Sequence, residues 1–151
     1  MIRNVIAHGT GTSRIEGHPA SPLENVTIEG LVLHVSRDPA APYESAVNAL
    51  EVAHAKNIRL ERIGVLWGAR FPTMAERALL RVGRGLVLDT FTGRQARLDS
   101  TDAAVVFQGV DGALVRDCVA PAGTAQFLRL SGDANRDIQQ IGNELRAAKI
   151  P

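Results

Sequence analysis

The sequence predicts an all-β protein, a right-handed parallel β-helix of about six coils. Apolar stretches return along the chain with polar residues at alternate positions, which is typical of strands with one buried face. Their first apolar residues are 21, 32, 28, 27 and 25 residues apart, and a repeat of this length is typical of a solenoid. The six first apolar residues are Val5, Val26, Ile58, Leu86, Ala113 and Ile138.

The N-terminal part of the chain contains the clearest of these strands. Residues 3–7 give a weak strand, and residues 14–16 give a brief strand that a Gly/Pro turn closes. In residues 25–35 a turn-forming Asn25 precedes alternating apolar residues that continue after Gly30. The same pattern predicts strands within residues 56–65, 84–91, 111–119 and 136–145.

Charged residues stand at every second position of these strands. A parallel sheet covered by helices on both faces has near-continuous apolar strands instead, so the pattern favours a coil of sheets with one wet side. Three phenylalanines at strand ends are expected to stack in the core. The charged residues are Glu29, Arg59, Glu61, Asp89 and Arg116, and the phenylalanines are Phe91, Phe107 and Phe127.

Three segments keep an α/β fold open as the alternative. Residues 44–55, 73–83 and 137–148 all have helical features, such as the capping-box pattern of Thr73 with Glu76. Helices between strands at these places would give crossover units and a parallel central sheet.

Composition indicates one domain over residues 1–151, with 45% hydrophobic and 22% charged residues. A formal net charge of +1 predicts neither a nucleic-acid partner nor a membrane surface. No apolar run reaches the ~18 residues of a membrane span, and the start lacks the order of a signal peptide. Cys118 is the single cysteine, so no intramolecular disulfide forms, and the cellular location stays open.

One group of side chains is suited to bind sugar. Trp67, Arg70 and Phe71 share a loop, and Tyr43 lies in the loop of the preceding repeat. An aromatic face against a sugar ring, with arginine on a uronate, would bind an acidic oligosaccharide. The alternative is that these residues cover the coil or an oligomer interface. The histidines lack metal-ligand spacing and the glycines lack a phosphate-binding pattern, so neither metal nor cofactor is expected.

Residues 17–26, Gly-His-Pro-Ala-Ser-Pro-Leu-Glu-Asn-Val, resemble a turn-and-strand motif of glycoside hydrolase family 28, the polygalacturonase-like enzymes. Lys-Asn-Ile-Arg-Leu-Glu, Asp-Gly-Ala-Leu-Val-Arg-Asp-Cys and Ile-Gly-Asn-Glu-Leu are similar to coil repeats of that family. The resemblance covers nearly the whole chain. It implies a parallel β-helix that corresponds to the C-terminal part of a longer, secreted or periplasmic relative.

The family's catalytic motifs are absent from this chain. The family cleaves galacturonosyl bonds with an Asn-x-Asp motif and an Asp-Asp pair, and the sequence contains neither. Gly17-His18 is followed by Pro19, and Arg14-Ile15 by Glu16, so these motifs also depart from the family pattern. No catalytic residue is therefore carried over. The pairs Asp99/Asp102 and Asp133/Asp137 are interpreted as turn residues.

Three functional hypotheses follow. The first is a catalytically incomplete, structural β-helix module with weak binding of acidic carbohydrate. The second is a galacturonan hydrolase whose site is completed by oligomerisation. The third is a module that self-assembles as a homo-oligomer through its open coil ends, because unpaired strand edges invite association. The repeat also begins at the first residues, which favours a fragment or an oligomer whose partner covers that end.

Overall fold

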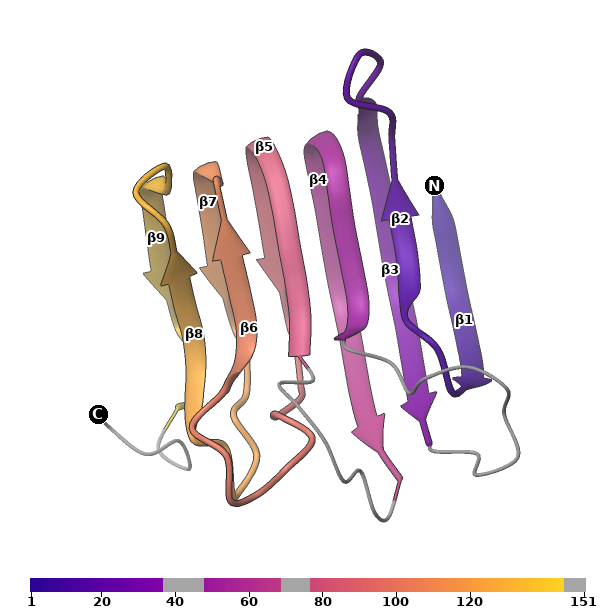
Figure 1. The fold of residues 1–151 in the computed structure, drawn as a ribbon, viewed down its shortest axis with the longest axis vertical. Helices are drawn as coiled ribbons and strands as arrows, with labels where there is room; N and C mark the ends of the chain where they lie inside the picture. The colour runs from indigo at the N-terminus through magenta and orange to yellow at the C-terminus, as the bar shows by residue number, and fades with distance from the viewer. Residues whose placement is uncertain (37–47, 69–76, 146–151) are drawn as a thin grey trace.

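The computed structural model describes residues 1–36, 48–68 and 77–145. These residues contain strands and no helix, which confirms the all-β prediction. The nine strands form one sheet in which all neighbouring strands are parallel (Figure 1). The strands are β1 Ile2–Gly9, β2 Ser13–Glu16, β3 Leu23–Val35, β4 Asn48–Trp67, β5 Arg77–Asp89, β6 Ala103–Gln108, β7 Asp111–Arg116, β8 Gln126–Ser131 and β9 Arg136–Ile141.

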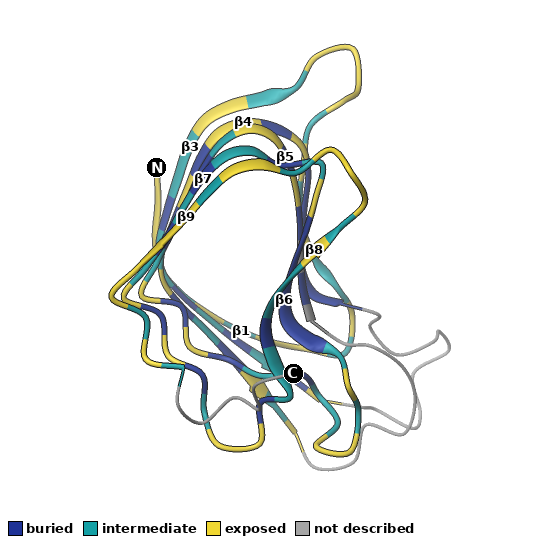
Figure 2. Cartoon of the chain, turned by 90° about the vertical axis from the view of Figure 1, so that its left-hand side faces the viewer, coloured by how far each residue is buried: buried dark blue, intermediate teal, exposed yellow. Residues whose placement is uncertain are grey.

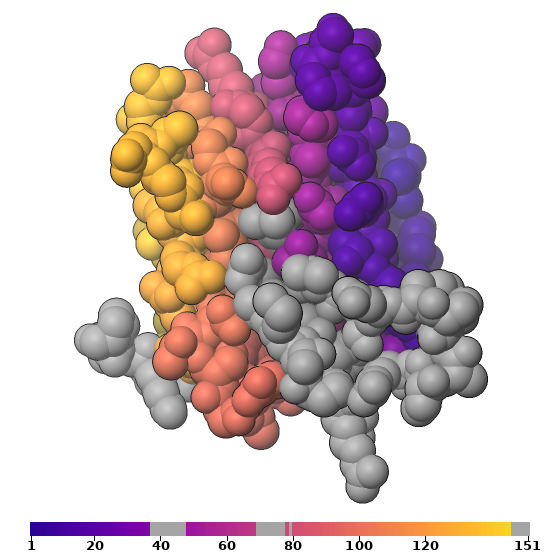
Figure 3. Space-filling view, viewed as in Figure 1, coloured from indigo at the N-terminus to yellow at the C-terminus, as the bar shows by residue number. Residues whose placement is uncertain are grey.

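The pairing divides the sheet into two rows that share the long strands β4 and β5. One row is β1–β3–β4–β5–β7–β9, and the other is β2–β4–β5–β6–β8. The sheet is not closed: among the described residues, the strands at each end of a row pair on one side only. In the space-filling view the colours follow one another from the indigo N-terminal end to the yellow C-terminal end (Figure 3).

The register confirms most of the predicted repeat. Five of the six first apolar residues pair laterally with one another along β3, β4, β5, β7 and β9. The first step was wrong, because Val5 pairs with Leu31 rather than with Val26. The strand over residues 23–35 contains two apolar segments separated by Gly30, and β1 matches the second segment instead of the first. The aligned residues are Val26, Ile58, Leu86, Ala113 and Ile138.

The core consists of columns of apolar side chains that continue from strand to strand. Seen along the row of strands, the ribbon surrounds a common interior (Figure 2). Phe91 and Phe127 are buried there and meet edge to face, with ring centroids 6.1 Å apart, and Phe107 is buried as well. The predicted core role of the three phenylalanines is therefore confirmed. The first interior column is Ile2, Ile28, Leu60, Leu88, Val115 and Gln140, and the second is Ile15, Val52, Leu80, Phe107 and Leu130.

The helical alternative is wrong over the described residues. Residues 48–55 belong to β4, residues 77–83 to β5 and residues 136–141 to β9. In β4, Ala49, Leu50, Val52 and Ala53 are all buried, so the strand lacks the alternation that would have identified it. Lateral pairing and burial outweigh the local preference of alanine for a helix. The capping-box residues Thr73 and Glu76 lie outside the described residues.

Candidate functional site

Residues with a positive φ form two columns across the sheet, and the strands bend at these laterally aligned positions. A positive φ is tolerated by glycine and, among other residues, most often by asparagine and aspartate. The columns enclose a short face made of residues 26–29, 58–61, 86–89, 113–116 and 138–141. The first corner column is Asn25, Asn57, Gly85, Gly112 and Asp137, and the second is Asn4, Gly30, Arg62, Thr90, Asp117 and Gly142.

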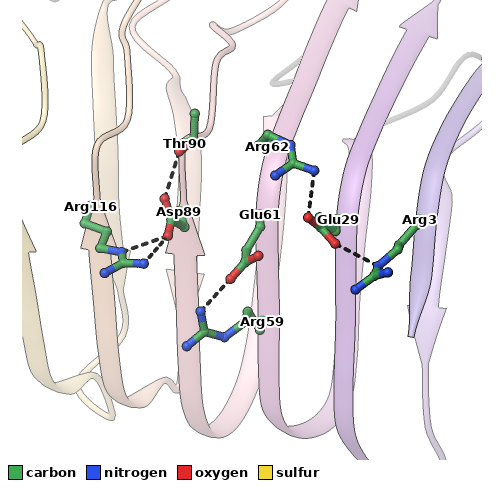
Figure 4. Close-up of polar contacts among 8 residues, drawn as sticks. All are labelled: Arg3, Glu29, Arg59, Glu61, Arg62, Asp89, Thr90 and Arg116. Carbon is green, nitrogen blue, oxygen red and sulfur yellow. Dashed lines mark hydrogen bonds and ion pairs between the residues drawn. The ribbon is translucent and has the colours of Figure 1, made fainter.

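A row of charged side chains crosses the outside of the short face beside the second corner column. The carboxylates Glu29, Glu61 and Asp89 occupy laterally paired positions of three neighbouring strands, with Arg3 and Arg116 at the two ends of the row. Since neighbouring strands lie about 4.8 Å apart, the three negative charges are close together. Figure 4 shows that each carboxylate contacts a guanidinium group.

The ion pairs of the charge row are short. Arg3 Nε lies 2.9 Å from one oxygen of Glu29, and Arg62 donates to the other oxygen at 2.7 Å. Arg116 Nε donates to Asp89 at 2.8 Å, and the Thr90 hydroxyl donates to the same carboxylate at 2.8 Å.

These contacts keep two of the carboxyl groups ionised. The hydrogen bond from Arg62, together with its charge and that of Arg3, lowers the pKa of Glu29 despite partial desolvation. Burial acts to raise the pKa of Asp89, but the Thr90 hydroxyl and the Arg116 guanidinium outweigh it and the net pKa is lowered. Both groups are therefore anions at neutral pH and hold no proton to donate.

A groove lies on the same face, over the first corner column. Two adjoining hollows of about 480 and 440 Å³ share Asn57, Gly85, Gly112 and Asp137. Gly85 and Gly112 leave the middle of the groove without side chains, and a Cβ at Gly112 would meet no atom within 4 Å. The remaining lining residues are Ile58, Arg59, Arg84, Leu86, Val87, Asp111, Ala113, Leu114, Arg136 and Gln139.

The groove combines an apolar floor with a polar rim. Val87 and Leu114 are half-buried between the polar side chains of Arg59 and Gln139 in the same lateral row. Arg84 forms no ion pair with any described residue, so its guanidinium can donate hydrogen bonds to a ligand carboxylate. Chemically, the groove can bind hydroxyl and carboxylate groups.

Of the four predicted ligand-binding residues, the structure describes only Trp67. It ends β4, is half-buried, and its indole N–H donates to the carbonyl of Arg94 at 2.8 Å. Tyr43, Arg70 and Phe71 lie outside the described residues. The predicted grouping of the four residues therefore stays a prediction.

Asp99, Asp102 and Cys118 have structural partners. Asp99 pairs with Arg97, and Asp102 lies 3.8 Å from Arg129. Cys118 is buried, and burial raises the pKa of its thiol to about 11. Within the described ranges, no group of three or more histidine, cysteine or acidic side chains could hold a metal ion, and no helix could span a membrane.

The sequence contained signals for the charge row, but not for the groove. The alternating charges of the predicted strands include all members of the row except Arg3. The groove depends on two glycines at the same lateral level, which only the register reveals. Comparisons with known proteins find no matching family model, no matching curated protein and no matching solved structure.

Proposed function

We propose that the chain is a right-handed parallel β-helix module, similar to the C-terminal coils of glycoside hydrolase family 28, that serves as a structural, self-assembling unit. Parallel neighbours offset by 25 to 32 residues support the coil, since Val26, Ile58, Leu86, Ala113 and Ile138 are laterally aligned. Right-handed crossovers between parallel strands are the rule in proteins, which supports the handedness.

The exposure of interior columns at both ends carries the proposal of self-assembly. Ile2 is 48% exposed, although Ile28 beside it in the first interior column is 3% exposed. Leu130 is 49% exposed, although Phe107 beside it in the second column is fully buried. Covering half of such a side chain in an interface contributes about 1 kcal/mol to the free energy of association, and the unpaired strand edges gain hydrogen bonds there.

Solution mass tests self-assembly directly. We expect light scattering at several protein concentrations to give a mass above that of the 16.2 kDa chain. The mass should be the same with and without oligogalacturonate, because Ile2 and Leu130, the exposed apolar residues at the two ends, do not line the groove. A monomer at all concentrations would contradict the proposal.

Weak binding of an acidic oligosaccharide is the second proposed function. Arg84 in the groove forms no ion pair with a described residue, which favours such binding, and so does the predicted cluster around Trp67. The chain has a single tryptophan, so its fluorescence reports on that cluster. We expect trigalacturonate to change the fluorescence or to protect the protein thermally, and neutral galactotriose to do neither. An equal response to both sugars would contradict recognition of the acid.

Hydrolysis completed by oligomerisation is the less favoured alternative. Glycosidic cleavage uses one carboxyl group with a raised pKa as the acid and a second carboxylate across the bond. In the charge row the pKa values of Glu29 and Asp89 are both lowered. We expect no release of reducing sugar from polygalacturonate, and release above the background of a heat-denatured sample would revive the alternative.

A further inference from the structure

The N-terminal end of the molecule carries a short strand with an open edge. β2 pairs with β4 on one side, and no described residue pairs with its other side. Arg14 and Glu16 are exposed on the outer side of β2, and Ile15 between them belongs to the second interior column. The indigo atoms of this end lie opposite the yellow C-terminal end (Figure 3).

Stacking of one copy's N-terminal end on another copy's C-terminal end in register would place Ile15 beside Leu130, but it would also bring like charges together. A further coil in register would place Arg14 beside Arg129, because these residues terminate the same lateral row. It would also place Ile2 beside Gln140, a polar residue at the end of the first interior column. Like charges directly opposite each other on neighbouring strands are destabilising.

A two-fold arrangement of N-terminal ends satisfies the same groups. In an antiparallel pair of β2 strands centred on Ile15, the two Ile15 side chains face each other. Arg14 then lies opposite Glu16 of the partner subunit, and the symmetry repeats this pair. The triplet Arg-Ile-Glu is self-complementary in charge only in this orientation.

We propose that two copies of this chain associate through their N-terminal ends, with the β2 edges paired antiparallel about Ile15. The proposal rests on the proposed self-assembly and specifies its partner and orientation. Because the interface is isologous, association stops at the dimer and does not continue into fibres. The dimer covers the N-terminal end of the second interior column, which begins with Ile15.

Charge reversal on β2 tests the orientation. We expect Arg14→Glu to raise the dimer dissociation constant at least about tenfold, because two attractive pairs become repulsive. The double variant Arg14→Glu with Glu16→Arg restores both pairs in reversed polarity and should dimerise like the original chain. Both variants equally lose the intramolecular pair of Arg14 with Glu51, whose charged atoms lie 3.5 Å apart. Rescue by the second change therefore reports on the interface alone.

Arg129→Glu is the matched control, since Arg129 is the equivalent position at the opposite end. We expect it to leave the dissociation constant unchanged in analytical ultracentrifugation. A dimer that Arg14→Glu leaves intact, or that the double variant fails to restore, would overturn the two-fold pairing. A mass that grows without limit with concentration would indicate stacking of N-terminal on C-terminal ends and would also overturn it. A monomeric original chain would overturn the proposed self-assembly itself.

Discussion

The replacement of Gly85 by alanine tests the corners of the sheet, where the backbone has a positive φ. Gly85 has a φ of +70°, and a non-glycine residue in this region costs roughly 1–2 kcal/mol. The smaller entropy of the unfolded alanine chain offsets about 0.4–1 kcal/mol of that cost. A Cβ at this position would also lie 2.6 Å from Oδ1 of Asn57.

The contact with Asn57 adds a second cost at Gly85. To avoid the Cβ, Asn57 has to turn its side chain and lose its 3.2 Å hydrogen bond to Asn25, which contributes about 0.5–1 kcal/mol at an exposed site. The total is about 2 kcal/mol for Gly85→Ala. Gly112 is the control, since its φ is +74° but its Cβ would meet nothing within 4 Å, so about 1 kcal/mol is expected there.

Urea unfolding of the variants measures both terms. In a background of Asn57→Gly, which keeps the corner conformation, Gly85→Ala should cost no more than Gly112→Ala does. A neutral or stabilising Gly112→Ala would contradict the positive φ at this corner. Equal stability of the two alanine variants would contradict the register that brings Asn57 next to Gly85.

Three further predictions concern the core, the charge row and the cysteine. Leu88→Ala should lower the free energy of unfolding by about 2–5 kcal/mol, because Leu88 is fully buried. Leu66→Ala, at a half-exposed outer position, should change it by no more than about 0.5 kcal/mol. Equal losses in urea unfolding would contradict the assignment of inner and outer sides. Because the pKa of Asp89 is lowered in the folded protein, its ion pair contributes stability that is fully present above about pH 4 and is lost as the pH falls through the folded-state pKa. Asp89→Asn should therefore weaken the fall of the free energy of unfolding at acid pH. An unchanged fall would contradict the role of the ion pair. Cys118 should react with a thiol reagent at pH 8 only after unfolding, since burial raises its pKa to about 11, and rapid labelling of the native protein would disprove its burial.

The repeat could be predicted from the sequence because lateral pairing in a parallel sheet aligns like with like. Asn57 and Gly85 lie in the same corner column, and Ile58 and Leu86, which follow them in the sequence, are paired laterally in the interior. An apolar residue after a left-handed turn residue is therefore visible in the sequence as well as in the structure. The alternating charges likewise predicted the wet outer side, where Glu61 now faces Arg59.

Other parts of the fold depend on neighbours that one sequence does not display. Residues 103–108 and 126–131 form β6 and β8, yet Ala103 to Phe107 is buried without alternation and has no strand signal of period two. The alignment of Val5 with Leu31 depends on Asn4 and Gly30 sharing a corner, which two different residue types conceal.

The charge row and the groove differ in what their arginines can still bind. Unscreened by partners, two carboxylates about 4.8 Å apart repel by about 1 kcal/mol even in water. Arg3, Arg62 and Arg116 offset that repulsion around Glu29 and Asp89, so releasing one of them for a ligand would restore it. The row therefore stabilises the stack of strands and is unsuited to bind an anion. In the groove, Arg84 forms no ion pair with a described residue, so binding of a carboxylate there would break no such pair.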